Sequence, residues 1–260
     1  MRIRNRRAER QQYLFALKQM VTRETRRKYA RSYLGIVWSV LNPLLHMSVM
    51  SLIFSAMFER SIDNFPIYLF TGTLIYTLFS DATSHGMSAL VDNRSMILKT
   101  KLSKQTFVIA RVLTALSNFG YSFVVYVILL FVFHIKFTWY MLLFPIPLIF
   151  MVLFSTGIAL GLSVIYVFFA DIKHLYSVFL HLLRYLCALF YPADRLSGTM
   201  RQVLDLNPVY NYILFARDVM MYGVMPEPVL WLKIILWGTA SFCFGYWLFH
   251  HMENGVMQRM

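Results

Sequence analysis

Three ionisable side chains, His174, His181 and Arg184, interrupt an apolar stretch in the second half of the chain. His181 and Arg184 follow His174 by 7 and 10 residues, so on an α-helix the three side chains fall within an arc of about 80°. Cationic side chains form charge-assisted hydrogen bonds with phosphate, and such a stripe could escort a phosphate through an apolar environment. The alternative is a structural role, in which Arg184 forms an internal salt bridge, for instance with Asp81.

Two tyrosines, Tyr76 and Tyr185, extend this set of candidates. Both lie in apolar stretches. Their rings are suited to stacking against the C–H faces of sugars, and equally to anchoring a helix at a membrane surface. Together with Asp81, His181 and Arg184 they form the candidate lining of a translocation path.

The amino-acid composition predicts the environment of these side chains. Of the 260 residues, 58% are hydrophobic and only 14% are charged, whereas a globular domain carries about 25% charged residues. A chain with so few charged residues must expose many apolar side chains, and such a surface requires lipid around it. The sequence therefore predicts an integral membrane protein of the all-α class.

The chain lacks the motifs that support catalysis or ATP binding. No glycine is followed by a lysine, which excludes a Walker-type phosphate loop, and neither HExxH nor CxxC occurs. Cys187 and Cys243 lie in apolar segments and offer no metal-binding spacing. We expect no cofactor and no metal on this chain, so that any ATP and Mg²⁺ would be bound by a separate subunit.

Six charge-poor intervals approach the length of about 20 residues that crosses a bilayer. An even number of spans places both ends on one side, and the positive-inside rule puts 17 of the 25 Lys and Arg residues inside against five outside. We therefore predict cytoplasmic termini in the inner membrane, with a basic segment over 1–36, a six-helix domain over 37–250 and a tail over 251–260. The predicted spans are 37–58, 66–83, 107–133, 140–169, 175–191 and 229–250.

The net charge of +13 is concentrated before the first span. Eleven of the 25 cationic residues lie within residues 1–31. A cluster at this position favours contact with anionic lipid headgroups over binding of nucleic acid.

Three segments outside the spans have apolar residues of their own. The first, 9–31, predicts an amphipathic helix on the membrane surface or, more simply, a topology anchor. The second, 84–106, predicts a cytoplasmic segment that docks on a partner, or a linker lying on lipid headgroups. The third, 192–227, predicts short re-entrant helices in the outer leaflet, broken at Asn207-Pro208 and shaping a pore or an exit.

The span over 140–169 carries two local signals. Gly157 and Gly161 form a small-residue pattern that permits close packing of helices. Pro145 and Pro147 predict a kink at the outer end of this span.

Four short motifs occur in order along the chain. The pattern LG-x-x-W-x-x-x-x-P begins at Leu34, and N-x-x-L-I-x-K-x-x-F-P begins at Asn93, with Leu-Ser in place of its final Phe-Pro. F-x-R-D-I occurs around Asp171 with alanine in place of arginine, and an NP dipeptide is followed after eight residues by Arg217. By these motifs, nearly the whole chain resembles the permease subunits of type-2 ABC exporters of O-antigen, teichoic acid and capsular polysaccharide. The matching residues are Leu34, Gly35, Trp38, Pro43, Asn93, Ile97, Lys99, Asp171, Asn207, Pro208 and Arg217.

This resemblance implies a transport subunit with no ATPase activity of its own. Two copies would form a homodimeric conduit in the membrane, each bound on its cytoplasmic side by a separate ATPase subunit. The cargo would be a lipid-linked glycan, commonly carried on undecaprenyl pyrophosphate. Docking of the ATPase would involve Asn93, Met96, Ile97, Leu98, Lys99 and Lys101. The substrate would enter past Arg26, Arg27, Lys28 and Arg31, and would leave near Asn207, Pro208 and Arg217.

Three other functions are compatible with a basic, aromatic, polytopic chain. A type-2 ABC permease for a smaller drug or lipid would share the same architecture. A polytopic glycosyltransferase or acyltransferase would need an acid/base constellation, and no paired carboxylates or His-Asp cluster occur at suitable spacing. A passive scaffold would not need intramembrane Asp81, His181 and Arg184.

Overall fold

The computed structural model describes residues 13–25, 35, 37–57, 64–100, 102–193 and 196–259, which form helices and loops with no strand among them. A first helix covers residues 13–25. The remaining elements are α2 (Val37–Met57), α3 (Phe65–Asp92), α4 (Arg94–Ile97), α5 (Lys104–Val132), the 3-10 helix η1 (Trp139–Leu143), α6 (Pro145–Phe168), α7 (Ile172–Tyr185), α8 (Gly198–Leu206), α9 (Pro208–Arg217), the π-helix η3 (Asp218–Tyr222) and α10 (Pro228–Arg259).

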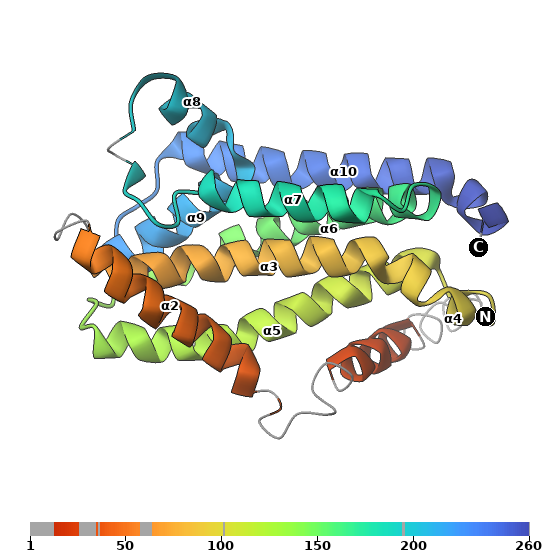
Figure 1. The fold of residues 1–260 in the computed structure, drawn as a ribbon, viewed down its shortest axis with the longest axis horizontal. Helices are drawn as coiled ribbons and strands as arrows, with labels where there is room; N and C mark the ends of the chain where they lie inside the picture. The colour runs from red at the N-terminus through yellow and green to blue at the C-terminus, as the bar shows by residue number, and fades with distance from the viewer. Residues whose placement is uncertain are drawn as a thin grey trace, which may run out of the picture.

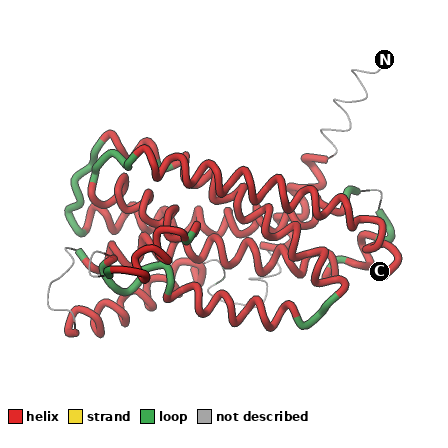
Figure 2. The backbone as a smooth tube through the Cα atoms, turned by 90° about the horizontal axis from the view of Figure 1, so that it is seen from above, coloured by secondary structure: helices red, strands yellow, loops and turns green. Residues whose placement is uncertain are grey.

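Helices α3, α6, α7 and α10 run roughly parallel to the long axis of the molecule, with α3 at the centre, whereas α2 crosses obliquely (Figure 1). Helix α3 packs against α5, α6 and α9, while α10 packs mainly against α6. Helix 13–25, α4 and the C-terminal end of α10 lie at one end, which we call the inner end, and α8 and α9 lie at the outer end (Figure 1). Figure 2 shows the same elongated bundle from a direction at right angles.

Within the part of the chain that the structure describes, three helical segments are long and apolar enough to cross a membrane: Lys104–Val132, Trp139–Phe168 and Pro228–Glu253. The predicted all-helical class is thus confirmed. Each of these helical segments overlaps one of the predicted spans. The last helix continues to Arg259, beyond the predicted boundary at 250.

The predicted span over 175–191 is wrong at its outer end, because α7 ends at Tyr185. Its 14 residues extend about 21 Å, less than the 30 Å or so of a bilayer core. The chain then turns, with Ala188 in a left-handed conformation at φ 46°. Side chains satisfy the carbonyls freed there: Asn207 donates to Leu186 at 2.7 Å, and Tyr68 donates to Ala188 at 3.1 Å. These long-range partners allow a non-helical backbone.

The segment 84–106, for which a cytoplasmic coupling helix was predicted, is mostly helical. Helix α3 continues to Asp92 rather than ending near 83, because Met87 and Leu90 lie on its buried face and extend the apolar contact with the bundle. Among the described residues, the short α4 and its flanking turns lie between α3 and α5.

Small residues let α6 and α10 approach closely. A methyl group at Gly157 would collide with the backbone of Ser241, and one at Gly245 would collide with the backbone of Gly157. The Ser241 hydroxyl donates to the Phe154 carbonyl at 3.0 Å, which ties the two helices together. The close packing predicted for Gly157 is confirmed. The kink predicted at Pro145 is wrong, because α6 begins at that proline, where it interrupts no hydrogen bond.

Candidate functional site

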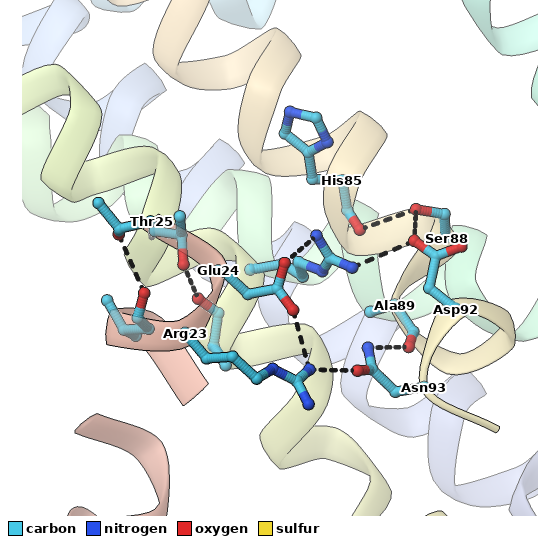
Figure 3. Close-up of polar contacts among 12 residues, drawn as sticks. Arg23, Glu24, Thr25, His85, Ser88, Ala89, Asp92 and Asn93 are labelled. Atoms are coloured by element: carbon cyan, nitrogen blue, oxygen red, sulfur yellow. Dashed lines mark hydrogen bonds and ion pairs between the residues drawn. The ribbon is translucent and has the colours of Figure 1, made fainter. Parts of the chain in front are cut away.

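An ion-paired cluster at the inner end joins helix 13–25 to the ends of α3 and α5 (Figure 3). We call Arg23, Glu24, Asp92, Asn93 and Arg111 the inner junction. The Glu24 carboxylate is buried at 7% exposure and pairs with Arg111 at 2.7 Å and with Arg23 at 2.9 Å. Arg111 also pairs with Asp92 at 3.1 Å.

Amphipathic packing brings Glu24 to this position. Met20 is buried, and Leu17 and Val21 pack against the core, whereas Leu14 and Phe15 are exposed. Glu24 follows Met20 by four residues and therefore shares its face of the helix. The predicted amphipathic helix is confirmed over 13–25, and its buried face carries a carboxylate that sequence reasoning missed. The sequence did contain a signal for this carboxylate, namely an acidic residue within a strongly basic segment.

The inner junction reaches the predicted coupling segment through Asn93. This residue lies between α3 and α4, and its side-chain oxygen accepts from Arg23 at 2.6 Å while its amide donates to the Ala89 carbonyl at 2.8 Å. Arg23 also donates to the sulfur of Met96 at 3.5 Å. The guanidinium group of Arg23 therefore connects helix 13–25 to α4.

The structure divides five of the six predicted docking residues into two groups. Asn93, Met96 and Ile97 face the protein, and Ile97 belongs to the hydrophobic core at 4% exposure. Leu98, at 54% exposure, and Lys99 face outward. Lys101 lies outside the described residues, as do the predicted entrance residues Arg26, Arg27, Lys28 and Arg31.

The candidate path residues also divide into two groups. Tyr76, His181 and Arg184 line a cavity of about 410 Å³ between α3 and α7. Asp81 and Tyr185 lie outside its lining, and Tyr185 is exposed. The alternative ion pair of Arg184 with Asp81 is not formed: the guanidinium carbon of Arg184 lies 5.2 Å from the centroid of the Tyr76 ring instead.

Two of the predicted exit residues, Asn207 and Pro208, form the start of α9. Asn207 is the N-cap of α9, where its side-chain oxygen accepts from the backbone N–H of Val209 at 3.0 Å, and Pro208 occupies the first turn. The predicted break between two short helices at this dipeptide is confirmed. A role of these residues in cargo exit stays a prediction.

Arg217, the last residue of α9, is buried at 2% exposure. It donates to the carbonyls of Tyr68 at 3.3 Å and Ala188 at 3.0 Å, and its guanidinium carbon lies 3.4 Å from the centroid of the Tyr68 ring. A methyl group at Gly72 would lie 2.7 Å from Nη2 of Arg217, so this glycine makes room for the guanidinium. Arg217 thereby joins α9, α3 and the turn after α7.

One carboxyl group in the outer segment has a perturbed affinity for protons. Burial raises the pKa of Asp218 to about 6, and the negative charge of Glu227 acts in the same direction. Adjacent Arg217 opposes the rise in pKa. The outer segment therefore contains a carboxylate whose charge is poorly solvated at neutral pH.

Long apolar helices, an amphipathic helix held through the buried Glu24 carboxylate and a half-open polar cavity between α3 and α7 fit the membrane domain of a transport protein. The chain belongs to the ABC-2 type transporter family, whose model matches residues 16–221. The resemblance drawn from the four motifs is thereby confirmed at the level of the family.

The chain is also similar to curated proteins over most of its length. It is 30% identical over 238 residues to the O-antigen export system permease protein RfbA of Myxococcus xanthus, covering 88% of this chain and 92% of that protein. The protein of the same name from Klebsiella pneumoniae is 28% identical over 218 residues, covering 82% and 83%. The polysialic acid transport protein KpsM of Escherichia coli is 21% identical over 241 residues, covering 90% and 92%.

Replacing Glu24 with glutamine should loosen helix 13–25. The change leaves two guanidinium groups without their shared carboxylate, and removing one partner of a buried pair costs about 3–5 kcal/mol. We expect faster hydrogen–deuterium exchange in residues 13–25 and a lower unfolding temperature in detergent. Glu253→Gln is the matched control, because its pair with Lys104 at 3.1 Å is more exposed. Unchanged exchange in residues 13–25 would show that the junction does not hold the helix.

Replacing Arg217 with lysine should destabilise the outer segment although the charge is kept. Lysine lacks the planar fork that reaches both carbonyls and lies over Tyr68. We expect the free energy of unfolding to fall by about 2–4 kcal/mol, since a charge-assisted hydrogen bond contributes about 1.5–3 kcal/mol. Arg201→Lys, in a half-exposed pair with Asp205, should change it by less than about 1 kcal/mol. Equal effects of the two variants in thermal denaturation would contradict this role.

Proposed function

We propose that the chain is the permease subunit of an exporter of lipid-linked polysaccharide, of the O-antigen or capsule type, in the inner membrane. Support comes from the names of its relatives, two of which are O-antigen export permeases and one a polysialic acid transport protein. Each of these names specifies a glycan. We assign the same class of cargo to this chain.

The energy would come from a separate ATPase subunit that binds ATP and Mg²⁺. The sequence contains no Walker-type loop, and the outward face of α4 supports a docking role. There Leu98 is exposed beside Lys99 and Arg94. An apolar side chain flanked by cations suits a groove with an apolar floor and an acidic rim. This surface is the observation on which the proposal depends most.

The inner junction offers a route for transmitting motion from this surface. Displacement of α4 would act on helix 13–25 through Asn93 and Arg23, and on α5 through Asp92 and Arg111. Ion pairs and hydrogen bonds of 2.6–3.1 Å transmit displacement well because their geometry is narrow. In this proposal, ATP-driven movement at the inner end repositions the surface helix next to the entrance.

Two copies of the chain, each with its own ATPase subunit, would complete the conduit. Helix α7 is too short to cross a bilayer alone, and its exposed face is apolar at Leu175, Val178, Phe179 and Leu182. Packing of a second copy would cover such a face. Helix 13–25 and the end of α10 share the inner end (Figure 1), which supports placing both termini in the cytoplasm.

Changing Leu98 to aspartate should release the ATPase subunit without unfolding the permease, because Leu98 is exposed. We expect a Walker-motif ATPase to co-purify with the tagged wild-type chain in mild detergent, and to be lost in this variant together with glycan export. Leu206→Asp is the matched control, since Leu206 is 69% exposed but lies at the outer end. A wild-type chain that exports glycan without any bound ATPase would refute the proposed mechanism.

Replacing Arg26, Arg27, Lys28 and Arg31 together with glutamine should impair export while membrane insertion continues. These residues would attract the anionic headgroup of the cargo, and the seven other cationic residues before the first span would still set the topology. The control replaces Arg2, Arg4, Arg6 and Arg7 instead, which removes the same charge farther from the membrane. The measurements are surface glycan and protease accessibility of the termini, and full export by the first variant would exclude an entrance at these residues.

A further inference from the structure

The last helix is longer than a bilayer requires. Helix α10 has 32 residues, which extend about 48 Å at 1.5 Å per residue, whereas the apolar core of a bilayer is about 30 Å thick. Its apolar span ends at Glu253, and its C-terminal end lies at the inner end of the bundle (Figure 1). Residues 253–259 therefore continue the helix past the span. We call these residues the inner tail.

The inner tail contacts the first turn of α5. The Lys104 Nζ lies 3.1 Å from Oε1 of Glu253 and donates to the Glu253 carbonyl at 3.4 Å. Close by, the Gln105 amide nitrogen lies 3.5 Å from Nδ1 of His250. Lys104 is the first residue of α5, where a positive charge is unfavourable to the dipole of that helix. The pair with Glu253 offsets this local cost, so it connects α5 to α10.

The other end of the inner tail contacts the end of α6. Helix α6 ends at Phe168, and Nη1 of Arg259 donates to the Phe168 carbonyl at 3.4 Å. The guanidinium carbon of Arg259 also lies 5.1 Å from the centroid of the Phe168 ring. A cation at this place satisfies a terminal carbonyl and complements the dipole of α6. Gly255 permits the approach, because a methyl group there would lie 3.1 Å from Cζ of Phe168.

Burial holds the inner tail in place between these two contacts. Val256 is 1% exposed and belongs to the hydrophobic core, and both Met252 and Phe168 pack against that core. A helix end with few buried contacts opens readily, whereas packed residues keep a helix closed. The inner tail is thus a packed piece of helix with α5 bound at its beginning and α6 bound at its end.

We propose that the inner tail is a rigid link that makes the start of α5 and the end of α6 move together, with Lys104, Glu253 and Arg259 as its positioning residues. The inference rests on the proposed function, because the movement would begin at α4, which precedes α5. Chains of packed side chains and ion pairs carry such coupling. None of these three residues belongs to the inner junction, so this is a second connection from α4.

The connection would end at α7. Helix α7 begins at Ile172, directly after the turn that follows α6. A displacement of the end of α6 would therefore move the start of α7, and with it one wall of the cavity between α3 and α7. Movement driven at α4 would thus reach both helix 13–25, through the inner junction, and α7, through the inner tail.

Hydrogen–deuterium exchange of the full-length chain in lipid nanodiscs tests the link itself. Lys104→Glu places a second carboxylate opposite Glu253, and we expect exchange to become about threefold faster or more at the start of α5 and also at residues 165–169. The Phe169 amide, which donates to the Ile165 carbonyl at 2.8 Å, reports on the last turn of α6. Lys104→Glu combined with Glu253→Lys restores a pair of reversed sign and should slow exchange again at both places.

Glycan export per ATP hydrolysed tests the role of the link in transport. Lys104→Glu and Arg259→Gln should each lower this ratio about threefold or more, because the ATPase stays bound at α4 while its movement reaches α7 less well. A purely structural role would lower export and ATP hydrolysis together and leave their ratio unchanged. The double variant should recover the ratio, as should Arg259→Lys, which keeps a cation beside the Phe168 carbonyl.

Lys136→Glu is the matched control, because it makes the same change of charge at an exposed residue beyond the opposite end of α5. It should alter neither measurement. Exchange that rises in Lys104→Glu only at the start of α5 would overturn the link, as would a wild-type ratio of export to ATP hydrolysis in both single variants. A wild-type chain with neither ATPase nor export would remove the proposed function alone, since the exchange measurement needs neither and still decides whether the inner tail connects α5 to α6.

Discussion

Charge transferred from water into an apolar bundle must be balanced by the protein itself, and this constraint organises the molecule. At the inner end, one buried carboxylate, Glu24, is shared by two guanidinium groups, and one of them also binds Asp92. At the outer end, Arg217 has no ion pair among the described residues and is stabilised by two carbonyls and an aromatic ring. Between these ends, Arg184 lines the cavity between α3 and α7, where its guanidinium carbon lies 5.2 Å from the centroid of the Tyr76 ring. The buried charges at both ends are therefore balanced within the protein.

The two ends of the bundle are stabilised by different kinds of contact. The inner junction links a surface helix to α3, α4 and α5 through side chains alone, so that small displacements can pass between them. The outer segment is fixed by bonds to backbone carbonyls and by close packing at Gly72, which leaves less freedom. This difference suits a transport subunit in which the inner end moves and the outer end stays rigid. In the proposed exporter, the driven end is the one that carries α4.

Much of the architecture was predictable because lipid imposes strong one-dimensional patterns. Apolar runs located most of the helices, the NP dipeptide marked the start of α9, and Gly157 marked the close approach of α6 and α10. The predicted helix boundaries are wrong where contacts with residues far away in the sequence, rather than the local sequence pattern, set the end of a helix. Helix α7 ends early because Asn207 and Tyr68 satisfy carbonyls beyond Tyr185. Helix α3 continues past its predicted end because its apolar face still finds a partner at Met87 and Leu90.

The sequence alone determined that this protein is surrounded by lipid, that it is helical, that its charge is asymmetric and that it carries the motifs of its family. These properties depend on composition and on spacing along a single helix. Only the tertiary structure decided that Glu24 joins Arg111, that Ile97 faces inward while Leu98 faces outward, and that Ser84 and Lys173 line the same cavity. The reason is that pairing and burial depend on which helices become neighbours. Residues about 90 positions apart in the chain, such as Ser84 and Lys173, share one cavity only after the bundle has formed.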